Sequence, residues 1–554
     1  MTWNCYQFEV NSIQRWVFGS GKLRAIVGGS QLVSGITEEL LDHTLDALSQ
    51  AHDDQIQFAR KAGGVFIALT ENPEALNSLR KIWPLMVARY APGLSFSTGF
   101  GHADTVGEAI TKARENISAG GNLPRPELPA ATPVMERSRR TGNQAVSTSR
   151  QEIIDFITDV QFKAEERAQH GGGRGGIGAK LADKLTLDGK VWPRDMEPAK
   201  DDDKHNFPFR RDDQGNVTNR YVAMVHADGN GLGQLLQGLQ FENGKDGIEQ
   251  RRRFSGALED ATFAACLTAC KDVLVPELGE NGLLPARPIL LGGDDLSFIV
   301  RADLALHFTQ VFLQAFEAET AKRLAEIPGV PAGGLTACAG IAYLRSNQPF
   351  YMGMELAESL CGHAKKQVRK AVGENMISAL CQHRCTDSLI SDWDALLDDS
   401  LTLPAREADD QRYRLTMEAW SLHRSANDKL PALENLQKLF AYLNQASLSR
   451  GPARKLVGMI GQHPSLIAQK YARWLEMLDK TQATGRGAGH FKHLLSLSGF
   501  GVPDDRAPFI RPRQPALDRD GKAICPTPLA EALALKAMGA IAWEIASTSE
   551  EDAA

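Results

Sequence analysis

Three aspartates in the middle of the chain have the residue type and the local sequence that metal-dependent phosphoryl transfer requires. Asp228 follows an apolar run, and Asp294 and Asp295 follow the glycine pair Gly292-Gly293. In-line displacement at a phosphate is stabilised by two cations about 3.5–4 Å apart. Magnesium takes hard oxygen ligands, chiefly carboxylates. We therefore expect Asp228, Asp294 and Asp295 to be catalytic and to hold two Mg²⁺ or Mn²⁺ ions.

Glycines beside these carboxylates would let a triphosphate approach the backbone closely. Asp228 opens the sequence Asp228-Gly229-Asn230-Gly231-Leu232-Gly233, a turn that leads into a helical pattern. Free N–H groups at a helix start favour a phosphate. Lys365 or Lys366, late in a further helical pattern, would neutralise the β- and γ-phosphates. The nucleotide-binding residues predicted on these grounds are Gly229, Asn230, Gly231, Gly233, Gly292, Gly293, Lys365 and Lys366.

Each of these features also has a structural explanation. Aspartate pairs are common in solvated hairpin turns, and lysines late in a helix complement its dipole. The combination of all of them, in this order along one chain, favours the site.

The hydrophobic pattern around the aspartates predicts the element order βαββαβα. Strands are expected at 221–227, 288–291, 296–300 and 335–343, and helices from 232, over 254–275, around 303–326 and over 352–370. The acidic turn then joins two strands of a hairpin, and Asp228 ends a third strand. Carboxylates that are distant in sequence would meet at one place.

The same order of elements recurs near the N-terminus, which indicates an internal duplication. The first copy has strands at 6–10, around 62–66 and at 93–99, and helices near 28–48 and over 106–117. Gly63-Gly64-Val65-Phe66 falls where the second copy has its Gly-Gly-Asp-Asp turn. The first copy is therefore expected to keep the turn, lose the carboxylates and be non-catalytic.

Composition restricts the class of protein. Hydrophobic residues make up 43% and charged residues 23%, values typical of folded globular chains. The 62 basic and 68 acidic side chains give a net charge of −6, so contacts with nucleic acid would be local or made through partners. No apolar run reaches the length of about 18 residues that a membrane helix needs, so we expect a cytoplasmic protein with no membrane contact.

The motifs resemble a known family. Residues 227–233, the turn 291–295, and the stretch from 339–342 to Ala364-Lys365 are similar to the GGDD palm of the large subunit of type III CRISPR effector complexes. Ile13-Gln14-Arg15-Trp16, followed by 21–30, resembles the opening of that family's first, non-catalytic palm. The resemblance covers roughly residues 4–375.

The resemblance implies an α+β fold with two ferredoxin-like palm domains and a helical C-terminal domain. The implied divisions are a first palm at 1–125, a linker or helical region at 126–217, a second palm with the active site at 218–375, and a helical domain at 390–554. It further implies that ATP is converted into cyclic oligoadenylates when target RNA is bound, by attack of a ribose 3′-hydroxyl on an α-phosphate. Guide-RNA-containing subunits and target RNA are then the expected partners.

Within that family, Asp228 and Asp295 correspond to the principal metal ligands and Asp294 to a supporting one. We expect three departures from the family. No HD nuclease domain is expected before the first palm, and no zinc element is expected at 134–142, where the family commonly has one but this sequence has no cysteine. Asn230 stands where many relatives have an acidic residue. Cys381-Gln382-His383-Arg384-Cys385 offers three ligands without a clear fourth, so no structural zinc is expected.

Two other functions stay open at this level. A stand-alone palm cyclase that makes a cyclic dinucleotide would use the same core motif, since a fold does not fix the product. A non-catalytic scaffold subunit would also contain two palms, although the retained aspartates argue against it. The helical pattern beyond about residue 390 and the duplicated palm favour the complex-bound enzyme.

Overall fold

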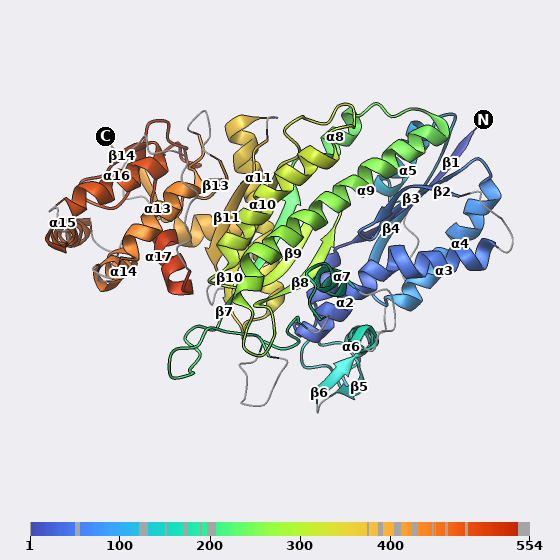
Figure 1. Ribbon diagram of the computed structural model, residues 1–554, viewed down its shortest axis with the longest axis horizontal. Helices are drawn as coiled ribbons and strands as arrows, with labels where there is room; N and C mark the ends of the chain where they lie inside the picture. Colours follow the sequence, from blue (N-terminus) through green and yellow to red (C-terminus); the bar gives the residue numbers. More distant parts are fainter. Residues whose placement is uncertain are drawn as a thin grey trace.

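Two β-sheets with helices packed on them form most of the molecule, and a helical C-terminal region lies at the far end from the N-terminus (Figure 1). The computed structural model describes residues 2–49, 56–120, 131–149, 152–169, 176–188, 191–196, 206–373, 376–385, 392–403, 411–423, 429–445, 448, 450–459, 464–481 and 486–540. The glycine-rich stretch 171–176 and the acidic stretch 193–216 are predicted to be flexible connections, because glycine entropy and uncompensated charge oppose packing. Of these, 171–175 and 197–205 lie outside the described residues, as does the acidic C-terminal end from 541 on.

The larger sheet has the strand order β13-β11-β10-β7-β9-β8. Its strands are β7 (Tyr221–Gly229), β8 (Ala286–Gly292), β9 (Asp295–Arg301), β10 (Ala337–Arg345), β11 (Ala379–Arg384) and β13 (Trp420–Ser421). Its helices are α8 (Leu232–Gly238), α9 (Gly244–Ala269), α10 (Ala305–Arg323) and α11 (Phe350–Val372). The predicted order βαββαβα is confirmed.

Both faces of the central strand β7 are buried, which explains its nearly continuous apolar sequence. Val225 and Ala227 face the core formed with α9 and α10, while Val222 and Met224 face α11 and the first copy. Asp228 is therefore the first polar side chain with access to solvent at the end of a rigid, buried strand.

The sheet continues past residue 375, where the second palm was expected to end. β11 pairs parallel with β10, and β13 pairs with β11. Within β11, Cys381 is fully buried and His383 packs against Trp393 with the ring centroids 5.0 Å apart. Residues 379–384 therefore form a strand of the larger sheet, with Cys381 in its core.

The smaller sheet has the order β2-β3-β1-β4. Its strands are β1 (Trp3–Asn11), β2 (Gln57–Ala62), β3 (Val65–Thr70) and β4 (Ser95–Ala103), and its helices are α1 (Ile13–Phe18), α2 (Leu23–Gly35), α3 (Leu41–Ser49), α4 (Pro73–Tyr90) and α5 (Val106–Ser118). A π-helical turn, Ile36–Leu40, joins α2 to α3 within the expected long helix. The order of elements matches that of the larger sheet, so the duplication holds in three dimensions.

A connecting region and a mainly helical region complete the α+β fold. The connecting region contains β5 (Ala145–Ser149), β6 (Glu152–Asp155), α6 (Phe156–Gln169), which packs on α2, and α7 (Ile177–Lys184). The C-terminal region contains α12 (Trp393–Leu396), β12 (Gln411–Arg414), α13 (Leu433–Leu443), α14 (Arg450–Met459), α15 (Pro464–Thr481), α16 (Gly487–Gly499), β14 (Gly501–Pro503), β15 (Ile510–Pro512), β16 (Ala523–Pro526) and α17 (Leu529–Met538). None of the described helices combines the length and the apolar character needed to cross a bilayer.

Gly340 sets the distance between β10 and α11, the helix that carries Lys365. A Cβ at Gly340 would lie 1.9 Å from the Ala357 carbonyl oxygen, so Gly340→Ala is expected to lower the free energy of unfolding by about 1–3 kcal/mol. Gly362→Ala is the matched control, because no atom lies within 4 Å of its added methyl group and alanine favours a helix by about 1 kcal/mol. Urea unfolding measures both, and equal midpoints for the two variants would contradict this packing.

Candidate active site

The acidic turn is a two-residue hairpin connection anchored to a neighbouring helix. Gly292 pairs with Asp295, which leaves Gly293 and Asp294 in the turn, and Gly293 has a φ of 63°. Glycine adopts this left-handed conformation without steric cost. The Thr262 hydroxyl of α9 donates a hydrogen bond of 2.7 Å to the Gly293 carbonyl oxygen. The turn is therefore held in a fixed position at the end of the sheet.

The three aspartates meet in space. β7 pairs with β9 up to Ala227 and Leu296, so Asp228 lies beside Asp295 at the end of the two strands. One carboxylate oxygen from each of Asp228, Asp294 and Asp295 lies within 4.8 Å of the other two. Oxygen ligands grouped in this way fit divalent cations.

Burial and mutual repulsion act on these carboxyl groups. Burial raises the pKa of Asp294 to about 6, and the Asp228 charge adds to the effect. Burial, followed by repulsion from Asp228 and Asp294, raises the pKa of Asp295 well above its ordinary range. Burial also opposes ionisation of Asp228, but Lys365 outweighs it and lowers the pKa of Asp228. The group has excess negative charge, so it fits a bound cation.

This excess charge makes the stability of the metal-free protein depend on pH. The pKa of Asp294 is raised from 3.8 to about 6, so the folded state holds its proton more tightly than the unfolded state and loses stability as pH rises through that interval. Mn²⁺ is therefore expected to raise the unfolding temperature more at about pH 7.5 than at about pH 5. Differential scanning fluorimetry measures this, with Asp294→Ala/Asp295→Ala as control. An equal Mn²⁺ effect at both pH values would contradict it.

Of the two predicted lysines, the structure brings only one to the aspartates. Lys365 Nζ contacts the Asp228 carboxylate and donates a hydrogen bond of 2.7 Å to the Gly229 carbonyl oxygen. Lys366 instead pairs with Asp394 at 2.8 Å, with 69% of its side chain exposed. Successive helical residues point about 100° apart, so adjacent lysines on α11 cannot both face the site.

The loop after Asp228 packs directly against the acidic turn. A Cβ at Gly229 would lie 2.7 Å from the Asp294 carboxylate, so a side chain there would collide with it. Gly231 has a φ of 66°, and Gly233 lies in α8 with open space around its Cα. The glycines thus allow loop and turn to approach each other.

Asn230 points away from the aspartates. Its amide nitrogen donates to the Thr336 hydroxyl at 3.0 Å and to the Ile377 carbonyl oxygen at 3.1 Å. Its backbone N–H also donates to the Thr336 carbonyl oxygen at 2.8 Å. Asn230 therefore fixes the loop to the sheet, which explains how an amide can stand at this position without adding a ligand to the acidic group.

Sequence reasoning missed a buried histidine next to the site. His226 lies two residues before Asp228 on the same face of β7, and its Nδ1 is 3.1 Å from the Ser297 hydroxyl. Burial lowers the pKa of His226 to about 4, so the ring is neutral near pH 7. The alternation of side chains along a strand could have indicated this position, since residues i and i+2 share a face.

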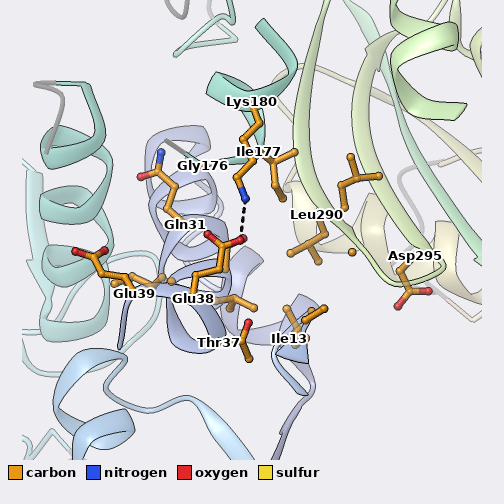
Figure 2. A pocket seen from close by; sticks show the side chains of 18 of the residues that line it. Ile13, Gln31, Thr37, Glu38, Glu39, Gly176, Ile177, Lys180, Leu290 and Asp295 are labelled. Carbon is orange, nitrogen blue, oxygen red and sulfur yellow. Dashed lines mark hydrogen bonds and ion pairs between the residues drawn. The ribbon is translucent and has the colours of Figure 1, made fainter. Parts of the chain in front are cut away.

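The hairpin tips of the two copies meet. A Cβ at Gly292 would lie 3.4 Å from the Gly63 Cα. A cavity of about 440 Å³ is lined by both copies and by α7, with Asp295 at one side (Figure 2). Figure 2 shows Gln31, Glu38 and Lys180 across from Asp295, and Lys180 pairs with Glu38 at 2.8 Å. Asp295 thus borders a space that neither copy forms alone.

Strand pairing corrects the expected alignment of the two copies by one residue. Ala62 pairs with Val65, so the two-residue turn Gly63-Gly64 corresponds to Gly293-Asp294. In the first copy, Glu9 pairs with Val65, just as Asp228 lies beside Asp295 in the second copy. Glu9 therefore occupies the position that corresponds to Asp228. The first copy therefore lacks carboxylates at its hairpin tip but keeps an acidic residue on its central strand.

The sheet, the helix arrangement and the acidic turn define the second copy as a palm domain. Comparison with family descriptions agrees: residues 221–373 match Cas10/Cmr2, second palm domain. This part of the chain is therefore similar to the second palm domain of the family that the motifs resemble. A search of curated proteins finds no match.

Solved structures of Csm1 are similar to the chain at low identity. Csm1 from T. onnurineus is 13% identical with a TM-score of 0.48, covering 89% of this chain and 65% of that one. A Csm1–Csm4 cassette in complex with AMPPNP is 12% identical with a TM-score of 0.38, covering 66% and 53%. A Csm1–Csm4 cassette in complex with cA4 is 12% identical with a TM-score of 0.43, covering 87% and 65%. The chain thus spans between about half and two thirds of these proteins' length.

Proposed function

We propose that this chain is a metal-dependent nucleotidyltransferase that converts ATP into cyclic oligoadenylates within an RNA-guided antiviral complex. The observation that carries the proposal is the convergence of Asp228, Asp294 and Asp295 beside Lys365, in a domain of the Cas10/Cmr2 palm family. A scaffold would have no use for a carboxylate group whose repulsion opposes its own burial.

Each residue of the site has a proposed task. Asp228 and Asp295 are the principal ligands of two Mg²⁺ or Mn²⁺ ions, and Asp294, packed against Gly229, supports them. Bound divalent ions supply charge stabilisation to the attacking and leaving oxygens. Lys365 moves its ammonium from Asp228 to the triphosphate, where it neutralises charge.

The loop and the turn position the nucleotide by their backbones. Gly229, Gly231 and Gly233 leave the loop after β7 free of side chains, and Gly292 and Gly293 do the same at the hairpin. The proposed reaction forms a bond from a ribose 3′-oxygen to an α-phosphate and releases pyrophosphate. Alignment of these two groups, with pre-oriented charges around them, is the main contribution that the protein makes.

The other parts of the chain are proposed to hold the active site in place and to connect it to partners. Residues 1–125 form the non-catalytic palm, 126–217 connect the palms, 218–375 hold the active site, and 390–554 form the helical domain. β11 and β13 attach the start of the C-terminal region to the catalytic sheet. Guide-RNA-containing subunits and target RNA are the proposed partners and control when the site is active.

Analysis of the products from ATP tests the proposal. The purified protein is incubated with labelled ATP and Mg²⁺ or Mn²⁺, with and without copurifying subunits and target RNA, and the products are resolved by mass spectrometry. Cyclic oligoadenylates that disappear with Asp294→Ala/Asp295→Ala are expected. A cyclic dinucleotide formed without partners would indicate the stand-alone cyclase instead. No product from an intact, RNA-bound complex would indicate the scaffold.

A further inference from the structure

An arginine of the first palm reaches the acidic turn of the second. Arg60 lies on β2, where the pairing with β3 shifts register between Phe58 and Arg60. Such a bulge re-aims the side chains that follow it. β2 packs against α9, the helix that anchors the turn through Thr262. Arg60 Nη2 lies 3.3 Å from the position that a Cβ of Gly293 would take, so the guanidinium rests directly against the turn.

Among the described residues, no carboxylate forms an ion pair with Arg60. Its Nε is closed to solvent and has no hydrogen-bond partner. The Arg60 side chain is half-buried and its guanidinium stays charged, so a nearby anion stabilises it. Asp294 and Glu259 are the anions whose ionisation its charge favours, and Asp294 belongs to the acidic group.

The charges of the site show why a second cation is useful there. Three carboxylates meet, and Lys365 contacts only Asp228. The turn residues Asp294 and Asp295 have no lysine or arginine ion pair among the described residues. Arg60 is a cation that touches their turn, and it comes from the palm without carboxylates at its tip.

We propose that Arg60 is a positioning residue that supplies the first palm's counter-charge to the Gly293-Asp294-Asp295 turn. Its charge limits the repulsion between the two aspartates and sets how tightly they hold divalent cations. The hairpin tips meet at Gly63 and Gly292, so a shift of one palm against the other would withdraw this charge. Its effect on turnover rests on the proposed function, whereas its effect on metal affinity does not.

Arg60→Gln, Arg60→Lys and a matched control test the proposal in the full chain. The control is Arg80→Gln, an exposed arginine of the same palm that stacks on Phe100 at 4.4 Å. Mn²⁺ affinity is measured by the electron paramagnetic resonance signal of free Mn²⁺, together with unfolding temperature and ATP turnover.

Arg60→Gln is expected to bind Mn²⁺ about three- to tenfold more tightly, because one positive charge near the ligands is removed. Its turnover is expected to fall by about tenfold. Arg60→Lys should stay close to the wild type in both, since it keeps the charge. The control should match the wild type throughout.

Unchanged Mn²⁺ affinity in Arg60→Gln would overturn the proposal. Weaker Mn²⁺ binding together with a lower unfolding temperature would also overturn it, because that pattern belongs to a residue that only holds the fold. If the wild type shows no turnover but Arg60→Gln still binds Mn²⁺ more tightly, the proposed function fails while the role of Arg60 stands. No measurable Mn²⁺ binding by any variant would reject both.

Discussion

Asp295→Asn is expected to reduce nucleotidyl transfer from ATP by about 100- to 1,000-fold, since a proposed principal metal ligand loses its charge while its shape is kept. The same change should raise the unfolding temperature of the metal-free protein. Burial and the charges of Asp228 and Asp294 raise the pKa of Asp295, and a neutral amide removes that unfavourable ionisation. Activity and stability should therefore move in opposite directions.

The matched control is Asp260→Asn, an exposed aspartate of α9 outside the acidic group. It should leave both turnover and unfolding temperature close to the wild type. Steady-state kinetics with ATP and thermal unfolding in chelator measure the two properties. An Asp295→Asn protein that keeps more than about a tenth of the wild-type rate would show that this carboxylate is not a principal ligand.

Lys365→Met is expected to lower kcat/KM for ATP by about 100-fold, comparable to the loss of one pre-organised hydrogen-bond donor in other enzymes. The ammonium is held beside the aspartates by the Asp228 carboxylate and by the Gly229 carbonyl oxygen at 2.7 Å. Much of the loss should appear in KM, because the lysine is proposed to bind the triphosphate before and during the reaction.

Lys366→Met provides the comparison for Lys365→Met. Lys366 pairs with Asp394 and is 69% exposed, so its loss should change kcat/KM by less than about threefold. Lys365→Arg keeps the charge and should therefore retain more of the rate than Lys365→Met does. Equal effects of the two methionine substitutions would contradict the placement of α11 relative to the aspartates.

The sequence was informative where side-chain period and turn chemistry were strong. β7 to β10 and α9 to α11 lie where the apolar pattern placed them, because each strand or helix buries a regular face in the core. The hairpin that carries the acidic turn could also be predicted, because two glycines lie between short apolar runs. The order of the three motifs along the chain supported the resemblance to the palm family.

Other features depend on contacts that no local pattern encodes. β11 joins the sheet by pairing parallel with β10 across an intervening helix, and the two-residue strand β13 has no periodicity to detect. The orientation of Asn230 depends on the Thr336 hydroxyl, and the separation of the adjacent lysines on α11 depends on the rotation of that helix. Arg60 lies far from the second palm in sequence, and only the packing of β2 against α9 brings it to the turn.

The fate of the ATP phosphates distinguishes nucleotidyl transfer from ATP hydrolysis. ATP labelled at the α-phosphate and ATP labelled at the γ-phosphate are given separately to the proposed RNA-bound complex, with wild-type protein or Asp228→Asn. We expect that α-label enters oligonucleotide, that γ-label leaves as pyrophosphate, and that Asp228→Asn abolishes both. Release of γ-label as inorganic phosphate, with no α-label in oligonucleotide, would contradict this expectation and identify an ATP hydrolase instead.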